Sequence, residues 1–310
     1  MSIVVENLTK KYGTQRAVDN ISFEVKTGEI VGFLGPNGAG KTTTMKIITC
    51  YMSPSDGDVK INGDSILEKY DYLKKKIGYL PENNPLYYDM PVIDYLKFVA
   101  ELQGVPSEKI QERIIRMVRV TGLNDEKHKK IGELSKGYRQ RVGLAQAMIH
   151  DPEILILDEP TTGLDPNQIV EIRKLIRELG KEKTVILSTH ILSEVEATCD
   201  RILIINKGQI VADGTSDILK RQAQGQEVLR VQISEAPVRD DIIIALKELD
   251  TVAMVDPVTD AQDTFLINSV DGMSSRKNIF NLCVKNNWLL TELTPIETKL
   301  EDIFRELTKK

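Results

Sequence analysis

The sequence is poor in cysteine and has no long apolar run. Its three cysteines, Cys50, Cys199 and Cys283, are odd in number and far apart with no CxxC pair, which is typical of reduced, mostly buried thiols in a cytosolic protein. No stretch approaches the roughly 18 consecutive apolar residues that a membrane span needs. The first residues also lack the apolar core and cleavage site of a secretory signal. We therefore expect any role at a membrane to depend on a partner protein.

The sequence has no basic excess, since 41 basic residues stand against 46 acidic ones and give a formal net charge of −5. Proteins that bind nucleic acids usually carry a basic excess or stripe, so we expect no nucleic acid as the main ligand. Hydrophobic residues make up 41% of the 310 residues, which is enough for a substantial core. The length suggests about two domains.

The first domain, expected over residues 1–220, alternates short β-branched runs with helical patterns. This alternation is typical of an α/β fold with a largely parallel sheet. An Asn-Lys-Gly turn after the last run predicts a hairpin. The predicted strands are 3–8, 21–25, 28–35, 153–158, 184–189 and 201–206, with the hairpin partner at 209–213.

A helical subdomain is expected at about residues 83–150, because this part lacks clear strand patterns. Ile110, Ile114, Met117 and Val118 are spaced as on one face of a helix, and Ser107 is placed to cap its N-terminus. We interpret this segment as a helical insertion in the α/β domain.

A second, smaller α+β domain is expected over residues 227–310, after a polar linker at 222–226. Its pattern predicts the order β-α-β-β-α-β, which suggests a ferredoxin-like fold. The predicted segments are 228–233, 238–249, 251–255, 264–268, 275–286 and 288–293. A last helix follows, with Thr298 and Glu301 in capping-box spacing and one apolar face made of Leu300, Ile303, Phe304 and Leu307.

A phosphate-binding loop is predicted at residues 35–42, where the sequence fits G-x-x-x-x-G-K-[ST] between a strand and a helix. Glycines let successive backbone N–H groups point at phosphate oxygens, and the helix N-terminus adds partial positive charge. The lysine would bridge the β- and γ-phosphates, and the first threonine would complete the shell of a Mg²⁺ ion. The alternative is a glycine-rich turn with a chance lysine. The candidate nucleotide-binding residues are Gly35, Asn37, Gly38, Gly40, Lys41, Thr42 and Thr43.

Two acidic residues, Asp158 and Glu159, stand at the end of the predicted apolar strand 153–158 and directly after it. The carboxyl ends of parallel strands are where open α/β sheets bind ligands, so Asp158 is predicted to hold Mg²⁺ and Glu159 to polarise the attacking water. His190 ends another such strand and is expected near the γ-phosphate. An acid that caps the following helix is the alternative interpretation, but it does not explain two acids beside a phosphate loop.

The segment Leu134 to Arg141, LSKGYRQR, identifies a family. It resembles the signature motif of ATP-binding-cassette ATPases and precedes the acidic strand as that family requires. The phosphate loop, Asp158 and Glu159, the turn at 163–165 and the histidine complete the motif set, which covers residues 4 to 220. The resemblance implies a P-loop ATPase fold with a helical subdomain, and ATP hydrolysis coupled to transport.

The resemblance also implies a head-to-tail dimer of two such chains with two ATP molecules between them. Ser135 and the backbone of Gly137, at the start of a helix, would then meet the γ-phosphate held by the partner chain. Asp165 would link the two sites. Tyr12 matches the aromatic residue that stacks on adenine in the family, although a tyrosine on a surface strand is an alternative.

This sequence departs from the family pattern in two places. Glu82 occupies the position of the usual glutamine, and could accept a hydrogen bond from water or ligate Mg²⁺. Lys136 and Tyr138 replace the usual glycine and glutamine of the signature. Both departures resemble the branch of exporter ATPases that work with ABC-2-type permeases. The segment 77–96 and the C-terminal extension look closest to the subunit associated with bacterial gliding motility.

The implied partners are therefore an integral-membrane permease and a second copy of the chain, at the inner face of the cell membrane. Residues 83–88 would form part of the groove that receives the permease, or would pack between subdomains. A soluble cassette ATPase that remodels ribosomes or nucleic acids is the first alternative function. A GTPase is the second, but its N-K-x-D motif is absent, because Asn206, Lys207 and Gly208 are followed by Gln209.

Overall fold

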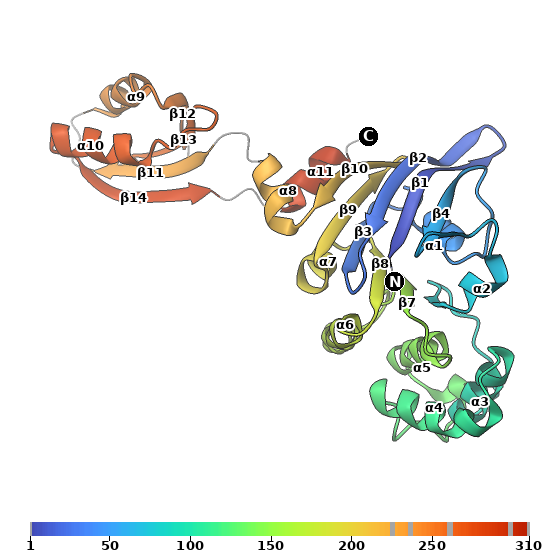
Figure 1. Ribbon diagram of the computed structural model, residues 1–310. Helices are drawn as coiled ribbons and strands as arrows, with labels where there is room; N and C mark the ends of the chain where they lie inside the picture. Colours follow the sequence, from blue (N-terminus) through green and yellow to red (C-terminus); the bar gives the residue numbers. More distant parts are fainter. Residues whose placement is uncertain (1, 224–226, 235–237, 259–262, 297–299, 309–310) are drawn as a thin grey trace. The chain divides into compact units, whose positions relative to one another are not determined.

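The apolar runs of the first 220 residues form a six-stranded central sheet with the strand order β10-β9-β3-β8-β7-β6 (Figure 1). Strands β3, β6, β7, β8 and β9 run parallel, and β10 pairs antiparallel with β9. The predicted parallel α/β sheet and its terminal hairpin are confirmed. The strands are β3 Ile30–Leu34, β6 Ile77–Leu80, β7 Ile154–Asp158, β8 Thr184–Thr189, β9 Arg201–Asn206 and β10 Gln209–Gly214.

The computed structural model describes residues 2–223, 227–234, 238–258, 263–296 and 300–308. The chain divides into two compact units, one made of Met1–Ser216 with Leu307–Lys310 and the other of Asp217–Glu306. None of the described helices has both the length and the apolar content needed to cross a bilayer.

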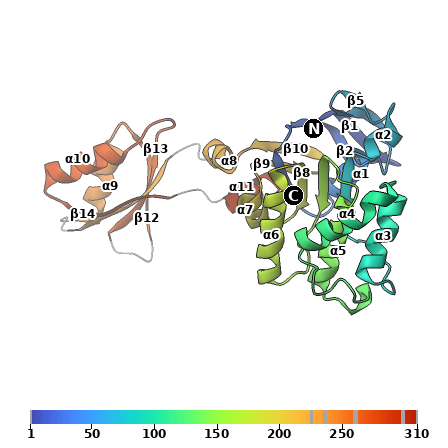
Figure 2. The same cartoon turned by 60° about the horizontal axis from the view of Figure 1, so that its bottom comes forward.

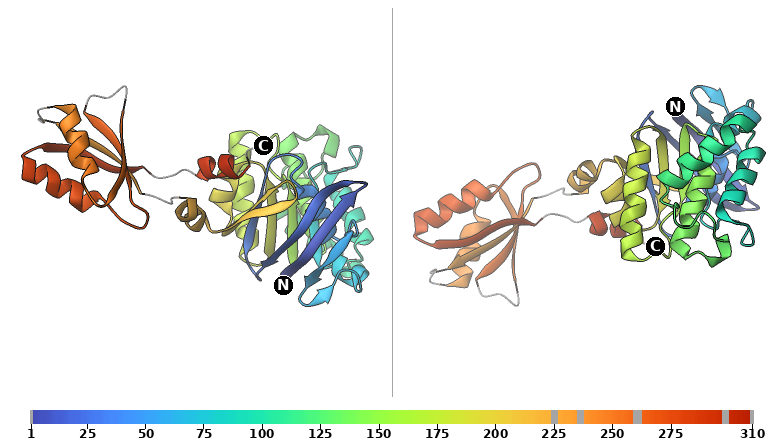
Figure 3. Two further views of the ribbon diagram at one scale, coloured as in Figure 1. Left: turned by 90° about the horizontal axis from the view of Figure 1, so that it is seen from above. Right: turned by 90° about the horizontal axis from the view of Figure 1, so that it is seen from below.

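A second, antiparallel sheet of order β2-β1-β4-β5 lies on one side of the central sheet, and most helices of the first unit lie on the other (Figure 3). Its strands are β1 Ile3–Tyr12, β2 Gln15–Val25, β4 Asp56–Ile61 and β5 Asp64–Ser65. The helices are α1 Lys41–Ile48, α2 Tyr70–Lys74, α3 Val92–Leu102, α4 Ser107–Val120, η1 Ile131–Glu133, α5 Lys136–Met148, α6 Pro166–Gly180 and α7 Leu192–Thr198.

The central sheet is buried on both faces, which explains why its strands are apolar without alternation. In β7, Ile154 and Ile156 join the core shared with α1 and the small sheet, whereas Leu155 and Leu157 join the core shared with α3 to α6. All five residues of β7 are buried. The strand that precedes Glu159 is therefore part of two cores at once.

The expected helical subdomain contains α3, α4, η1 and α5, and Figure 2 shows α3, α4 and α5 lying together. The predicted apolar face of α4 is buried. The predicted capping role of Ser107 is wrong, because Pro106 occupies the N-cap position and Ser107 is the first helical residue. The carbonyl of Pro106 accepts the hydrogen bond of Lys109 N at 2.8 Å, so the first turn starts one residue earlier than the serine suggested.

Asp151 links the helical subdomain to the central sheet. Its carboxylate lies 2.8 Å from the guanidinium of Arg113 on α4 and 3.0 Å from the ammonium of Lys183, next to β8. Burial alone would raise the pKa of Asp151, but hydrogen bonds and charge from Lys183 and Arg113 outweigh it and lower the pKa from 3.8 to about 2. The ionised carboxylate therefore stabilises the folded chain.

We expect Asp151→Asn to lower the free energy of unfolding at pH 7 by about 1 kcal/mol, since the partly exposed carboxylate is screened by solvent. A carboxyl group whose pKa is lower in the folded than in the unfolded state stabilises the fold fully at a pH above its unfolded pKa. This stabilisation is lost as the pH falls through its folded pKa. The difference between variant and wild type should shrink as pH falls from 3.8 towards about 2. Urea unfolding followed by circular dichroism at pH 7 and pH 3 measures it. Glu178→Gln, which breaks an exposed pair with Lys181, is the control. An equal deficit at both pH values would contradict the assignment.

The second unit contains the predicted β-α-β-β-α-β order. Its antiparallel sheet has the order β12-β13-β11-β14, and apolar side chains of α9 and α10 join its core. Thr298 of the predicted capping box and residues 224–226 of the predicted linker lie outside the described residues, and α8 extends to Ala223. The elements are α8 Ser216–Ala223, β11 Val228–Ser234, α9 Arg239–Lys247, β12 Val252–Pro257, β13 Thr264–Ser269, α10 Arg276–Asn286, β14 Leu289–Ile296 and α11 Leu300–Leu307.

Candidate active site

The loop between β3 and α1 has the backbone that a phosphate cradle requires. Gly40 is the N-cap of α1 with a φ of 110°, and a Cβ there would lie 2.4 Å from the carbonyl oxygen of Ala17. Only glycine fits this position. No side chain caps the first turn of α1, so its N–H groups remain available to an anion.

A cavity of about 530 Å³ opens beside this loop. It collects most of the predicted site from four separate parts of the chain. Three lining residues, Gln15, Ala17 and Thr162, were not predicted, because no motif marks them. The lining is formed by Gln15, Ala17, Asn37, Gly38, Gly40, Lys41, Thr42, Thr43, Glu82, Glu159, Thr162 and His190.

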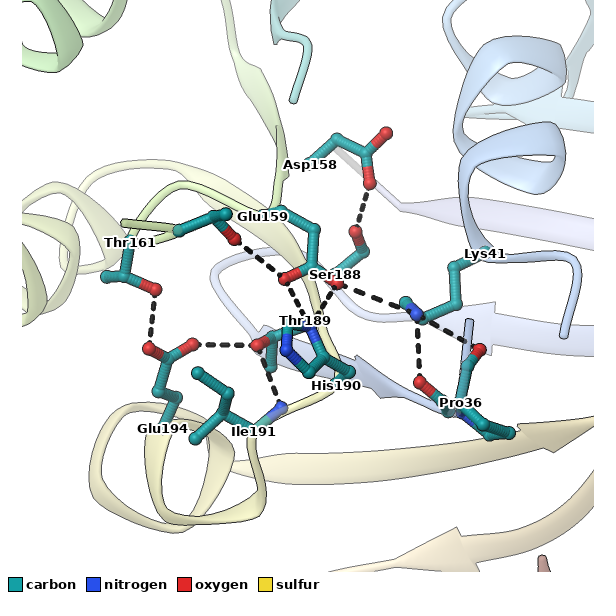
Figure 4. A network of polar contacts seen from close by, with 12 residues as sticks. Pro36, Lys41, Asp158, Glu159, Thr161, Ser188, Thr189, His190, Ile191 and Glu194 are labelled. Carbon is teal, nitrogen blue, oxygen red and sulfur yellow. Dashed lines mark hydrogen bonds and ion pairs between the residues drawn. The ribbon is translucent and has the colours of Figure 1, made fainter. Parts of the chain in front are cut away.

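Lys41 is almost fully buried at the start of α1. Its ammonium donates hydrogen bonds to the carbonyl oxygens of Gly35 at 2.8 Å and Pro36 at 3.3 Å, and it lies 3.5 Å from a carboxylate oxygen of Glu159 (Figure 4). A buried ammonium needs such partners because desolvation is costly. The lysine therefore connects the phosphate loop to the acidic strand end.

Glu159 and His190 are in direct contact. The two carboxylate oxygens lie 3.0 and 2.9 Å from Nδ1 of His190, and the hydroxyl of Thr162 donates to one of them at 3.2 Å. Glu159 has a positive φ of 50°, and its N–H donates to the carbonyl of Ser188 on β8 at 3.0 Å. The carboxylate lies between His190 and Lys41 in Figure 4, and Glu159 lines the cavity.

Asp158 is fully buried at the end of β7 and does not line the cavity directly. The Ser188 hydroxyl donates to its Oδ1, while its Oδ2 has no hydrogen-bond partner among the described residues. Burial raises the pKa of Asp158 above its ordinary value, and the charge of Glu159 adds to this, although the hydroxyls of Ser188 and Thr42 and the ammonium of Lys41 oppose it.

These oxygen atoms fit Mg²⁺. A carboxylate oxygen without a partner and the nearby Thr42 hydroxyl are hard donors of the kind that Mg²⁺ prefers, and such ions usually take few protein ligands beside phosphates and water. The described residues contain no cluster of three or more His, Cys, Asp or Glu side chains that would hold a metal by themselves.

Ser135 and Gly137 lie outside the cavity of their own chain. Ser135 is the exposed N-cap of α5, and its hydroxyl oxygen accepts a hydrogen bond from Tyr138 N at 3.3 Å. Gly137 is buried, and a Cβ there would lie 2.5 Å from the side chain of Gln168. Asp165 caps α6 by accepting from Gln168 N at 2.9 Å. Gln168 thus lies against both the signature and Asp165, and neither Ser135, Gly137 nor Asp165 lines the cavity.

Tyr12 also lies outside the cavity lining. It is about half exposed at the end of β1, where its hydroxyl donates to the sulfur of Met52 at 3.1 Å and the ammonium of Lys10 lies 5.8 Å from its ring centre. Gln15 and Ala17 of β2 line the cavity in its place. Glu82 is exposed and lines the cavity.

The family profile described as "ABC transporter" matches residues 18–162. The chain is 33% identical over 311 aligned residues to a bacitracin transport ATP-binding protein, BcrA of Bacillus licheniformis, covering 99% of this chain and 98% of that one. The chain belongs to the ATP-binding-cassette (ABC) transporter family. This ABC protein is an ATP-binding subunit and an ATPase, so the predicted family and activity are confirmed.

Further relatives of the ABC subunit agree. The Nod factor export ATP-binding protein I of Burkholderia orbicola is 33% identical over 76% of this chain and 78% of its own length. The dimeric structure of the ATP-binding cassette MJ0796 in a post-hydrolysis state with ADP and Pi has a TM-score of 0.63 at 25% identity, covering 69% of this chain and 98% of that chain. The predicted fold class is confirmed.

Proposed function

We propose that this ABC subunit pairs head to tail with a second copy and hydrolyses ATP·Mg²⁺ to drive a separate ABC-2-type permease as an exporter. The observation that carries the proposal is the division of the site. The cavity holds the phosphate loop, Glu159 and His190, whereas Ser135 lies at an exposed helix N-terminus outside it. A helix N-terminus with a free face is an anion site, and a second chain would complete each cavity with it.

In this proposal the residues of the cavity bind and orient the triphosphate. Lys41 exchanges the carbonyls of Gly35 and Pro36 for β- and γ-phosphate oxygens. Thr42 and Asp158 hold Mg²⁺, with Glu82 as a further oxygen donor, and the ion supplies positive charge to the phosphate oxygens. Asn37, Gly38, Gly40 and Thr43 contribute loop contacts, and Tyr12 stacks on adenine.

Glu159 performs the proton transfer. Its carboxylate accepts a hydrogen bond from the attacking water and takes up its proton as the water oxygen bonds to the γ-phosphorus and the bond to the leaving oxygen breaks. His190 holds Glu159 by the 2.9 Å contact and reaches the γ-phosphate with its other face. Ser135 and the backbone of Gly137 from the partner chain stabilise the charge that develops on the phosphate.

A mixing experiment tests the head-to-tail site. Lys41→Ala removes the phosphate grip but keeps the signature, whereas Ser135→Arg blocks the signature but keeps the grip. Each variant alone should be nearly inactive, and an equal mixture should recover about a quarter of the wild-type rate, because half of the random dimers contain one intact site of two. ATP turnover of the mixture measures this. No gain over the separate variants would contradict the shared site.

The surface at residues 83–88 supports a permease as the partner. Tyr87 and Tyr88 are each about half exposed, although the ring of Tyr87 also packs against Tyr95 and Phe98 with centres 6.0 and 5.6 Å apart. A second cavity, of about 470 Å³, lies between this segment and the start of α5. A hollow with exposed aromatic side chains suits a helix of a partner protein.

Copurification from detergent-solubilised membranes tests this partner and the location at the inner face of the cell membrane. We expect one polytopic membrane protein to accompany the chain. Tyr87→Ala with Tyr88→Ala should release it without changing ATP affinity. The bacitracin transport and Nod factor export relatives support an exporter, and the resemblance of segment 77–96 makes gliding motility the first process to examine. Recovery in a ribosome fraction instead would favour a soluble remodelling ATPase.

A further inference from the structure

A buried carboxylate lies behind the Glu159–His190 pair. Glu194, on helix α7, is 1% exposed. Within the described part of the chain, Glu194 forms no ion pair with a Lys, Arg or His side chain. Instead, each of its carboxylate oxygens accepts one hydroxyl hydrogen bond, from Thr161 at 2.5 Å and from Thr189 at 2.7 Å (Figure 4).

The two threonines belong to the two segments that carry the reactive pair. Thr161 lies two residues after Glu159, in the turn that follows β7, and Thr189 directly precedes His190 at the end of β8. The Thr189 oxygen also accepts a hydrogen bond from the N–H of Ile191 at 3.1 Å, which fixes the backbone on the other side of the histidine. Both threonines are buried. The Glu194 carboxylate therefore joins these segments independently of the direct contact between Glu159 and His190.

A buried carboxylate without a cation is costly, and an apolar residue would fill the same place between Leu192 and Val195 with less desolvation. A packing role therefore does not account for glutamate at this position. Its two oxygens accept hydrogen bonds from two hydroxyl donors that lie on different segments. Leucine has no acceptor for these donors, and glutamine has only one acceptor oxygen. Reactive groups must be held within a few tenths of an ångström, and such precision usually depends on supporting hydrogen bonds.

We propose that Glu194 is a positioning residue that sets the distance between the Glu159 carboxylate and the His190 imidazole by holding Thr161 and Thr189 together. The inference rests on the proposed roles of Glu159 and His190 in ATP cleavage. Glu194 does not line the nucleotide cavity, so it acts on the geometry of cleavage rather than on ATP binding.

Steady-state kinetics and ATP binding by Glu194→Ala and Glu194→Gln test the proposal. Because a misplacement of about 1 Å can cost about 100-fold in rate, we expect kcat to fall about 100-fold for alanine and about 10-fold for glutamine. The Kd for ATP should stay within about threefold, since no cavity residue changes. Glu196→Gln on the same helix is the matched control, because Glu196 accepts from Ser216 at 3.2 Å and does not touch the site. It should keep kcat within about twofold.

A double-mutant cycle separates positioning from general destabilisation. In a His190→Ala background, Glu194→Ala should lower the remaining rate by less than about twofold, because the group it positions is gone. Thr161→Ser should keep most of the rate and Thr161→Val should lose about tenfold, which tests the hydroxyl without creating a cavity. An undiminished loss in the His190→Ala background, or full activity of folded Glu194→Ala, would overturn the proposal. Full activity of His190→Ala itself would instead overturn the proposed function.

Discussion

Glu159→Gln should lower ATP turnover by about 100- to 10,000-fold while leaving ATP binding intact, because general-base catalysis contributes on this scale. The amide keeps the shape of the side chain and one hydrogen bond to His190, which lies 2.9 Å from the carboxylate. It loses the basicity that accepts the proton of water and the negative charge near the γ-phosphate. The variant should therefore accumulate as an ATP-bound dimer, visible by light scattering in Mg²⁺ and ATP.

The control for this experiment lies at the other end of the same strand. Glu153 directly precedes β7, is partly exposed and pairs with Lys76 at 2.7 Å. Glu153→Gln makes the same chemical change without touching the cavity, and should keep turnover within about twofold. A Glu159→Gln protein that stays monomeric in saturating Mg²⁺ and ATP, or that hydrolyses ATP at the wild-type rate, would refute the assigned role.

Lys41→Ala should weaken ATP binding itself, by about 10- to 150-fold, since hydrogen bonds to a charged group contribute about 1.5–3 kcal/mol. Lys41 is 6% exposed, and its ammonium lies within reach of both the loop carbonyls and Glu159. No other described lysine or arginine lines the cavity, so none can replace it. Titration with a fluorescent ATP analogue measures the change in Kd.

Lys46→Ala is the matched variant on the same helix. The Lys46 ammonium lies 5.9 Å from the ring centre of Tyr51, outside the cavity, and its loss should change the Kd for ATP by less than about twofold. Unchanged affinity in Lys41→Ala would remove the physical account of the loop. If the Lys41→Ala variant no longer unfolds cooperatively, Lys41→Met should be measured instead, because methionine keeps the apolar stem of the side chain.

The phosphate loop and the acidic strand end could be predicted because their chemistry depends on near neighbours in the sequence. The seven residues from Gly35 to Lys41 set the loop, and the four apolar residues Ile154 to Leu157 with the two acids that follow define β7 and its end. The role of Glu194 could not be predicted, because Thr161 lies 33 residues away and the pairing exists only after β7 and β8 lie side by side. The positions of Gln15 and Ala17 in the cavity lining could not be predicted for the same reason, since β2 reaches the cavity only through the arrangement of two sheets.

Short strands were also not predicted from the sequence. Strands β4, β5 and β6 have at most six residues, and their apolar positions are too few to show a period. The start of α4 was misplaced by one residue, because a serine after a proline resembles a cap while the proline carbonyl already begins the first turn. The C-terminal unit was predicted more completely, since its strands alternate and its helices are long enough to show their faces.

The double burial of β7 has a consequence for how this protein can change. Because neighbouring residues of one strand face two different cores, a larger or smaller side chain anywhere along it disturbs both sides of the sheet and displaces the acids at its tip. The rate of ATP hydrolysis and the stability of the fold therefore both depend on the packing of this strand. Under the proposed function, adaptation to a new partner is easier at Tyr87 and Tyr88, because these side chains are exposed and do not line the nucleotide cavity.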